Sequence, residues 1–273
     1  MNSLINISTY LNDKSVLSYR LDMYLTNNNS VYLNMGYVPG GNASVPGGNA
    51  IVPIHLNTIE NSQIHNLMKS MNMNIDSLVI WELMTIIESK SHNFKIIHSD
   101  DEESIKKVCA SKKIKYNLSN DKIDLMMYIH NDIINGGFIN TFIKSVEIVN
   151  NGGCAIYKIG SLYDKLKIKL LYVLNDIYDQ IYLYKSTLSN DIYVLLMNKK
   201  DVEMNHVSNL LSLLKKRKNK NVSDIFTTFP YYNIELSKIQ MYYNKILYSE
   251  AASESASESA SESASEWIKT FTK

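Results

Sequence analysis

From residue 31 to residue 198, short apolar runs alternate with segments long enough to form helices. This alternation is typical of a mostly parallel β-sheet with helices on both faces. After residue 199 the apolar positions recur with helical spacing, first at 202–214 and then at 234–247. The pattern therefore predicts an α/β domain followed by C-terminal helices.

The end of the α/β region carries the clearest local signals. Residues 155–159 form an apolar run with a single lysine, Lys158, near its end, and a helix-length segment follows. Apolar runs at 180–184 and 192–197 flank the turn-forming segment 186–190. We expect a buried strand, a crossover helix and then an antiparallel hairpin with an acidic residue, Asp191, at its turn.

Composition divides the chain further. Residues 16–25 fit a short helix or a strand equally well, and this alternative stays open. Glutamates recur every four residues from Glu250 to Glu266, so a helix there would place like charges on one face. The predicted segments are an N-terminal extension (1–30), the α/β domain (31–198), a helical extension (199–249), a flexible acidic Ser/Glu/Ala linker (250–266) and an aromatic tail (267–273). We expect the tail to dock back onto the same domain rather than onto a partner.

Charge and cysteine content set mild bounds. The chain has 273 residues, 45% hydrophobic content and a formal net charge of +1, so contact with nucleic acid has to be local. The basic run Lys215–Lys220 is interpreted as a solvated loop, with RNA or partner contact as the alternative. Cys109 and Cys154 are too few and too far apart in the sequence to suggest a disulfide framework, so we expect both to be reduced thiols. No apolar run predicts a membrane span, no signal peptide is recognisable, and the six histidines lack metal-ligand spacing, so no metal site is predicted.

A glycine-rich segment follows the first apolar run of the α/β region. Residues 32–41 contain Gly36, Pro39, Gly40 and Gly41, and the segment 38–43 is repeated at 45–50. Such glycines let the backbone approach a ligand closely, although a pair of surface turns explains them equally well. This segment resembles the first motif of FtsJ-like RNA methyltransferases, with Asn34 where that family has an acid.

Two later segments extend that resemblance. Residues 124–129 are similar to the family's strand that ends in a catalytic aspartate, but Ile129 stands at that position, and a shifted frame offers His130 or Asp132. Lys158 and Asp191 match a lysine and an acid that flank a ribose 2′-hydroxyl in the family. The resemblance implies a Rossmann-like S-adenosylmethionine-dependent methyltransferase fold. The alternative to a functional role for Lys158 is that it is a lysine at a strand end whose side chain simply extends into solvent.

A longer and more scattered resemblance covers most of the chain. Residues 33–36, 154–163, 176–185 and 241–248 look like corresponding parts of the small subunit of poxvirus-type mRNA capping enzymes. That resemblance implies a methyltransferase fold without activity of its own, which binds the large capping-enzyme subunit and stimulates its guanine-N7 methyltransferase. The reduced thiols and the absence of a recognisable export signal predict a cytoplasmic location, with a virion or viral factory as further options.

Two hypotheses follow, and a viral scaffold protein is a third. The first is a catalytically degenerate regulatory subunit in a heterodimer with the large capping subunit, with Lys158 and Asp191 as vestiges and no cofactor expected. The second is an active S-adenosylmethionine-dependent RNA 2′-O-methyltransferase, with the cofactor at the glycine-rich segment. For the first, tyrosines after residue 199 are candidate interface anchors: Tyr231, Tyr232, Tyr242, Tyr243 and Tyr248.

Overall fold

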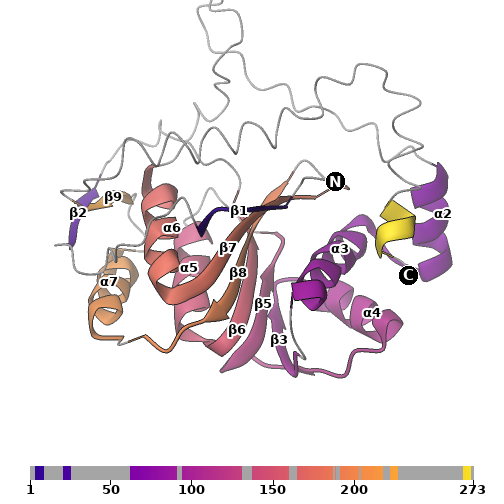
Figure 1. The fold of residues 1–273 in the computed structure, drawn as a ribbon, viewed down its shortest axis with the longest axis horizontal. Coiled ribbons are helices and arrows are strands. Elements are labelled where there is room, and N and C mark those ends of the chain that lie inside the picture. Colours follow the sequence, from indigo (N-terminus) through magenta and orange to yellow (C-terminus); the bar gives the residue numbers. More distant parts are fainter. Residues whose placement is uncertain are drawn as a thin grey trace, which may run out of the picture.

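A computed structural model describes residues 4–8, 21–25, 62–90, 94–130, 137–159, 165–186, 188, 191–202, 204–217, 222–226 and 267–271. Its centre is a seven-stranded sheet in the order β1-β7-β8-β6-β5-β3-β4 (Figure 1). The strands are β1 (Leu4–Asn6), β3 (Ile96–Ser99), β4 (Asn117–Leu118), β5 (Ile123–Tyr128), β6 (Val149–Lys158), β7 (Tyr178–Lys185) and β8 (Ile192–Lys199). A separate two-stranded ribbon joins β2 (Leu21–Leu25) to β9 (Val222–Phe226).

The strand directions confirm the predicted α/β class. Strands β3, β4, β5 and β6 pair in parallel, whereas β8 runs antiparallel to both β6 and β7. Strands β3 to β7 therefore share one direction, and β1 and β8 oppose them. The register Tyr184↔Tyr193 confirms the expected terminal hairpin. The sheet is thus mostly parallel, Rossmann-like and closed by an antiparallel hairpin.

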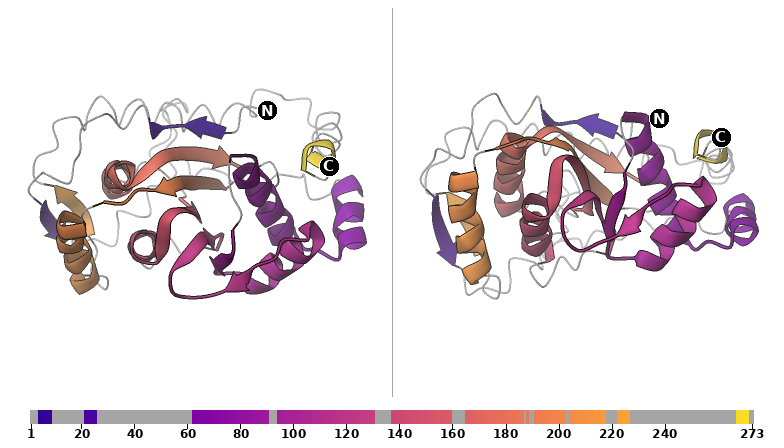
Figure 2. Two further views of the ribbon diagram at one scale, coloured as in Figure 1. Left: turned by 60° about the horizontal axis from the view of Figure 1, so that its bottom comes forward. Right: turned by 90° about the horizontal axis from the view of Figure 1, so that it is seen from below.

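Helices cover both faces of the sheet and create two cores (Figure 2). Helices α5 (Gly137–Glu147), α6 (Lys165–Ile177) and α7 (Met204–Arg217) lie on one face; α2 (Ser62–Met71), α3 (Ile75–Lys90) and α4 (Glu102–Lys112) lie on the other. Alternation along β6 sends Ala155 and Tyr157 into the first core and Cys154 and Ile156 into the second. Lys158 follows the second set, so its side chain belongs to the α3 face.

Helix α3 is buried on nearly every side. Every residue from Ser77 to Met84 is buried, including the polar Ser77 and Glu82, so the helix is enclosed all round and not along one stripe only. Asn74 caps its amino end, since its Oδ1 accepts the Ser77 amide at 2.8 Å. The helix therefore brings its first turn to a fixed place at the edge of the sheet.

A short C-terminal helix, Trp267–Phe271, packs against α3 and confirms that the aromatic tail docks on its own domain. Trp267 is 1% exposed, and both Trp267 and Phe271 belong to the core on the α3 face. The indole Nε1 of Trp81 donates a 2.5 Å hydrogen bond to the carbonyl of Phe271. The C-terminal helix thus contacts α3, which lies 190 residues earlier in the chain.

Several boundaries differ from expectation. Residues 4–6, assigned to an extension, form an edge strand that pairs with β7. Residues 21–25 form a strand, which settles the open alternative for that part, and its partner β9 lies in the segment expected to be helical. Strands β1 and β2 each pair with a strand distant in sequence, and local periodicity does not reveal such pairing. The predicted helix at 234–247 and the acidic linker lie outside the described residues.

Candidate functional site

A pocket of about 340 Å³ opens at the edge of the sheet where the parallel strands end. In open α/β sheets, ligands bind outside the carboxyl ends of the strands. The pocket is lined by side chains from α3, from the ends of β5 and β6, and from the start of β8: Ile75, Asp76, Val79, Ile129, His130, Lys158, Asp191 and Tyr193. The structure therefore brings the predicted site residues Ile129, Lys158 and Asp191 together.

One part of this edge, which we call the β6–β8 corner, consists of Lys158, Asp191 and Tyr193. Lys158 Nζ lies 2.5 Å from Asp191 Oδ1, and the two side chains are 26% and 33% exposed. Antiparallel pairing of β6 with β8 sets Lys158 opposite Tyr193, two residues beyond Asp191. The lysine at the strand end thus forms an ion pair at the pocket wall instead of simply reaching solvent.

The turn that carries Asp191 is held from behind by α3. Glu82 is fully buried, and its two carboxylate oxygens accept hydrogen bonds from the hydroxyls of Tyr184 and Ser186, the latter at 2.7 Å. The Ser186 amide then donates to the Asp191 carbonyl at 3.2 Å. A buried carboxylate on α3 therefore positions the acid of the β6–β8 corner.

Ile129 occupies the position at which the resemblance to FtsJ-like methyltransferases implies an aspartate. Its side chain is 4% exposed and lines the pocket. The shifted-frame candidate His130 also lines it and is 47% exposed, whereas Asp132 lies outside the described residues. The residue at the end of β5 on the α3 face is consequently apolar, and Lys158 has Asp191 as its carboxylate partner in the pocket.

The second part of the edge, the β3–β5 corner, consists of Asp100, Asp101, Ile129 and His130. From β3 the chain passes through α4 to β4 on one side, while β5 lies on the other side of β3. This reversal is the topological switch point, the usual ligand position in such sheets. Here the Asp100 carboxylate accepts the amides of Ile129 and His130 at 2.9 and 2.8 Å. Side-chain hydrogen bonds therefore join the two strand ends directly.

The β3–β5 corner also shifts two acid pKa values in opposite directions. Burial raises the pKa of Asp100, with the hydrogen bonds from the Ile129 and His130 amides opposing that shift. Burial alone would raise the pKa of Asp101 too, but hydrogen bonds from Ser104 and His130 outweigh it and lower that pKa. Asp101 is thereby favoured as an anion.

The amino end of α4 is already neutralised. Asp101 caps it by accepting the Ser104 amide at 3.0 Å, and Glu102 and Glu103 occupy the first turn. A helix that binds an anionic ligand leaves its terminal amides and positive dipole available. These three acids make this helix end unsuitable for a phosphate or carboxylate group.

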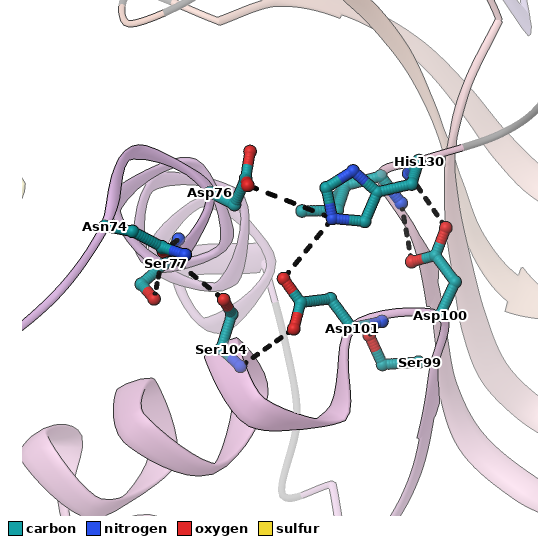
Figure 3. A network of polar contacts seen from close by, with 9 residues as sticks. Asn74, Asp76, Ser77, Ser99, Asp100, Asp101, Ser104 and His130 are labelled. Atoms are coloured by element: carbon teal, nitrogen blue, oxygen red, sulfur yellow. Dashed lines mark hydrogen bonds and ion pairs between the residues drawn. The ribbon is translucent and has the colours of Figure 1, made fainter.

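A mixed cluster of Asp76, Asp101 and His130 lies where the two helix amino ends meet this corner (Figure 3). His130 Nε2 is 3.3 Å from Asp101 Oδ2 and 4.0 Å from Asp76 Oδ2. Asp76 and Asp101 lie 54 and 29 positions before His130 in the chain, so their meeting depends on the sheet order and was not indicated by sequence spacing. The Asp-Asp pair directly after the strand Ile96–Ser99 was the available signal.

The remaining predicted residues are placed as follows. The glycine-rich segment with Gly36, Pro39, Gly40 and Gly41 lies outside the described residues, as do the interface tyrosines after residue 230. Of the basic run, Lys215 begins the last turn of α7 and pairs with Glu147, so the run starts in a helix and not in a loop. In the described ranges, no helix is long and apolar enough to cross a membrane.

Comparisons with known proteins give limited results. No protein-family model matches the sequence, and no curated protein matches it. Among solved structures, one described as an S-adenosylmethionine-dependent methyltransferase from Clostridium acetobutylicum ATCC 824 is similar, with 12% identity and a TM-score of 0.23. The match covers 55% of this chain and 84% of that one. A likeness this distant carries no functional argument, so the function is argued from the pocket.

Proposed function

We propose that this chain is a methyltransferase-like protein without catalytic activity of its own, which binds and stimulates the guanine-N7 methyltransferase of an mRNA capping enzyme. The observation that carries this proposal is Ile129, a buried apolar side chain at the pocket position where the resemblance calls for an acid. A positioned acid or base contributes about 10²- to 10⁴-fold to a rate, so its replacement by isoleucine removes most of the chemistry.

The described residues do not fit S-adenosylmethionine. At the switch point the Asp100 carboxylate already binds the backbone amides of Ile129 and His130. The segment after β3 reads Asp100, Asp101, Glu102, Glu103, and so offers acids where a cofactor carboxylate needs amides and glycines. We therefore assign no catalytic step that uses this cofactor.

Binding is the use that remains for an intact fold with a degenerate site. The resemblance to a capping-enzyme small subunit supplies the partner class, a larger subunit that carries the guanine-N7 methyltransferase domain. Stimulation requires that the partner's active conformation bind this chain more tightly than its inactive one. Typical coupling changes affinity about fivefold or more, which is easily measured as a higher kcat or a lower KM.

The test incubates the purified chain with radiolabelled S-adenosylmethionine and capped RNA, alone and with a capping-enzyme large subunit. We expect no methyl transfer by the chain alone, and a stable complex with a faster N7 reaction when the partner is added. Absence of a complex, or a complex whose rate is unchanged at saturation, would contradict the regulatory role.

The pair of Lys158 and Asp191 in one pocket specifically favours the second candidate, an active RNA 2′-O-methyltransferase. Single-turnover 2′-O methylation that disappears in Lys158→Ala and survives in Lys115→Ala, an exposed lysine outside the pocket, would establish it. The variant Ile129→Asp adds a further control. Because the β3–β5 corner does not fit the cofactor, we expect this restored acid to leave the chain inactive.

A further inference from the structure

Three side chains with metal-binding atoms converge at the β3–β5 corner from three different elements. Asp76 lies in the first turn of α3, Asp101 caps α4, and His130 follows β5. Figure 3 shows the His130 ring pointing between the two carboxylates. One ligand atom from each side chain lies within 4.8 Å of the other two.

These distances suit a small divalent ion. With metal–ligand bonds of about 2.0–2.2 Å, neighbouring ligand atoms lie about 3 Å apart. His130 Nε2 and Asp101 Oδ2 are 3.3 Å apart, and Asp76 Oδ2 is 4.0 Å from the same nitrogen. The Asp76 ligand atom also lies within 4.8 Å of the Asp101 ligand atom, so the three atoms form a triangle slightly larger than a bound ion requires.

Hydrogen bonds fix the backbone around the cluster, and they use other atoms than the proposed ligand atoms Asp101 Oδ2 and His130 Nε2. Asp101 uses Oδ1 to accept the Ser104 amide, while Oδ2 faces His130. The His130 amide is fixed by Asp100 at 2.8 Å. Asn74 Oδ1 accepts from Ser104 Oγ at 3.4 Å as well as from the start of α3, so the two helices that carry the acids are linked.

The cluster differs from ordinary helix capping in its donor set and its surroundings. Two carboxylates and one imidazole are the mixed oxygen and nitrogen ligands of first-row transition metals. Asp76 and His130 also line the 340 Å³ pocket, so an ion held by three protein ligands would keep open positions toward it. Asp100 adds a third carboxylate to this corner. The pocket lysine, Lys158, forms its ion pair with Asp191 at the other corner.

We propose that Asp76, Asp101 and His130 bind one divalent transition-metal ion, whose open coordination positions face the pocket. The site is independent of the proposed regulatory function, because it follows from ligand atoms and cavity alone. The ion would balance the excess negative charge at the switch point. It would also give the pocket an electrophilic wall opposite the β6–β8 corner.

The experiment uses the full chain, freed of metal with a chelator and titrated with Mn²⁺ by calorimetry and electron paramagnetic resonance. We expect one equivalent to bind and Zn²⁺ to displace it, as the general affinity order for these ions requires. Asp76→Asn and His130→Gln should each weaken Mn²⁺ binding tenfold or more. Asp179→Asn, an exposed acid on β7, is the matched control and should bind as the wild type does.

A second measurement keeps the proposal testable if a variant folds poorly. In the wild-type chain, one equivalent of Zn²⁺ should shift the ring resonances of His130 before those of the exposed His65 on α2. Absence of stoichiometric binding, wild-type affinity in both site variants, or shifts confined to other histidines would each overturn the proposal.

Discussion

The two corners of the pocket are built in opposite ways. At the β3–β5 corner, both carboxylate oxygens of Asp100 accept hydrogen bonds from backbone amides, so this side chain stabilises the fold. At the β6–β8 corner, Lys158 and Asp191 form an ion pair at a partly exposed wall, and Glu82 supports the turn that carries Asp191. The difference teaches that one edge of a sheet can use one corner to join strand ends and still present charged groups to a ligand at the other corner.

The strongest way to break the β6–β8 corner is to remove its support on α3. Glu82→Ala leaves the hydroxyls of Tyr184 and Ser186 buried without this acceptor and opens a cavity. We expect the free energy of unfolding to fall by about 3 kcal/mol, measured by urea denaturation. Glu82→Gln, which keeps one acceptor and the volume, should lose about half of that. A loss below about 1 kcal/mol for Glu82→Ala would mean that the network does not hold the turn.

The β3–β5 corner should rank second. Asp100→Ala removes two hydrogen bonds to a carboxylate, each of which contributes on the order of 1 kcal/mol net at a partly buried site. We expect a loss of about 2 kcal/mol and faster amide exchange at Ile129 and His130 than in the wild type. Asp100→Asn, which retains one acceptor, is the control and should fall between the two. Unchanged exchange at both amides would show that Asp100 does not join the strand ends.

Breaking the pair at the β6–β8 corner should have a small effect on stability. Lys158 and Asp191 are 26% and 33% exposed, and ion pairs near the surface contribute about 0–1 kcal/mol. Lys158→Met should therefore change the free energy of unfolding by less than about 1 kcal/mol. A larger loss, measured in the same urea experiment, would make this pair as structural as Asp100 and would remove the contrast between the corners.

The smallest effect concerns His98, on the other face of β3. Burial lowers its pKa below 6.5, the nearby Lys144 acts in the same direction, and His98 Nε2 lies 2.7 Å from the Tyr128 hydroxyl. Between the folded-state pKa and 6.5 the unfolded chain binds more protons, so this residue makes stability rise with pH in that window. An NMR titration of the ring should give a midpoint below 6.5. A midpoint at or above that value would contradict the prediction.

Local sequence signals predicted the β6–β8 corner, whereas in the β3–β5 corner only Ile129 and His130 were singled out, through the family resemblance. The hairpin of β7 and β8 was readable because two apolar runs flank a turn only a few residues long. The lysine at the end of β6 and the acid at the hairpin turn then had to meet once β6 paired with β8. Only the resemblance to a methyltransferase family gave that meeting a chemical meaning.

The aspartates of the β3–β5 corner were missed because the order of strands in a sheet is not a local property of the sequence. Asp76, Asp101 and His130 come from three elements, and they meet only because β3 lies between β4 and β5. The edge strand β1 and the ribbon of β2 and β9 escaped prediction for the same reason. A strand of three to five residues carries too few alternating positions to identify it without its partner.

The docking of the short helix Trp267–Phe271 has a consequence for the order of folding. Its hydrogen bond to Trp81 spans 190 residues, and closing so long a loop costs entropy that only a nearly complete α3 face can offset. The contact is therefore expected late, after the transition state, with φ-values near zero. Trp267→Ala should then speed unfolding while leaving the folding rate unchanged, so this helix would contribute to kinetic stability by slowing unfolding.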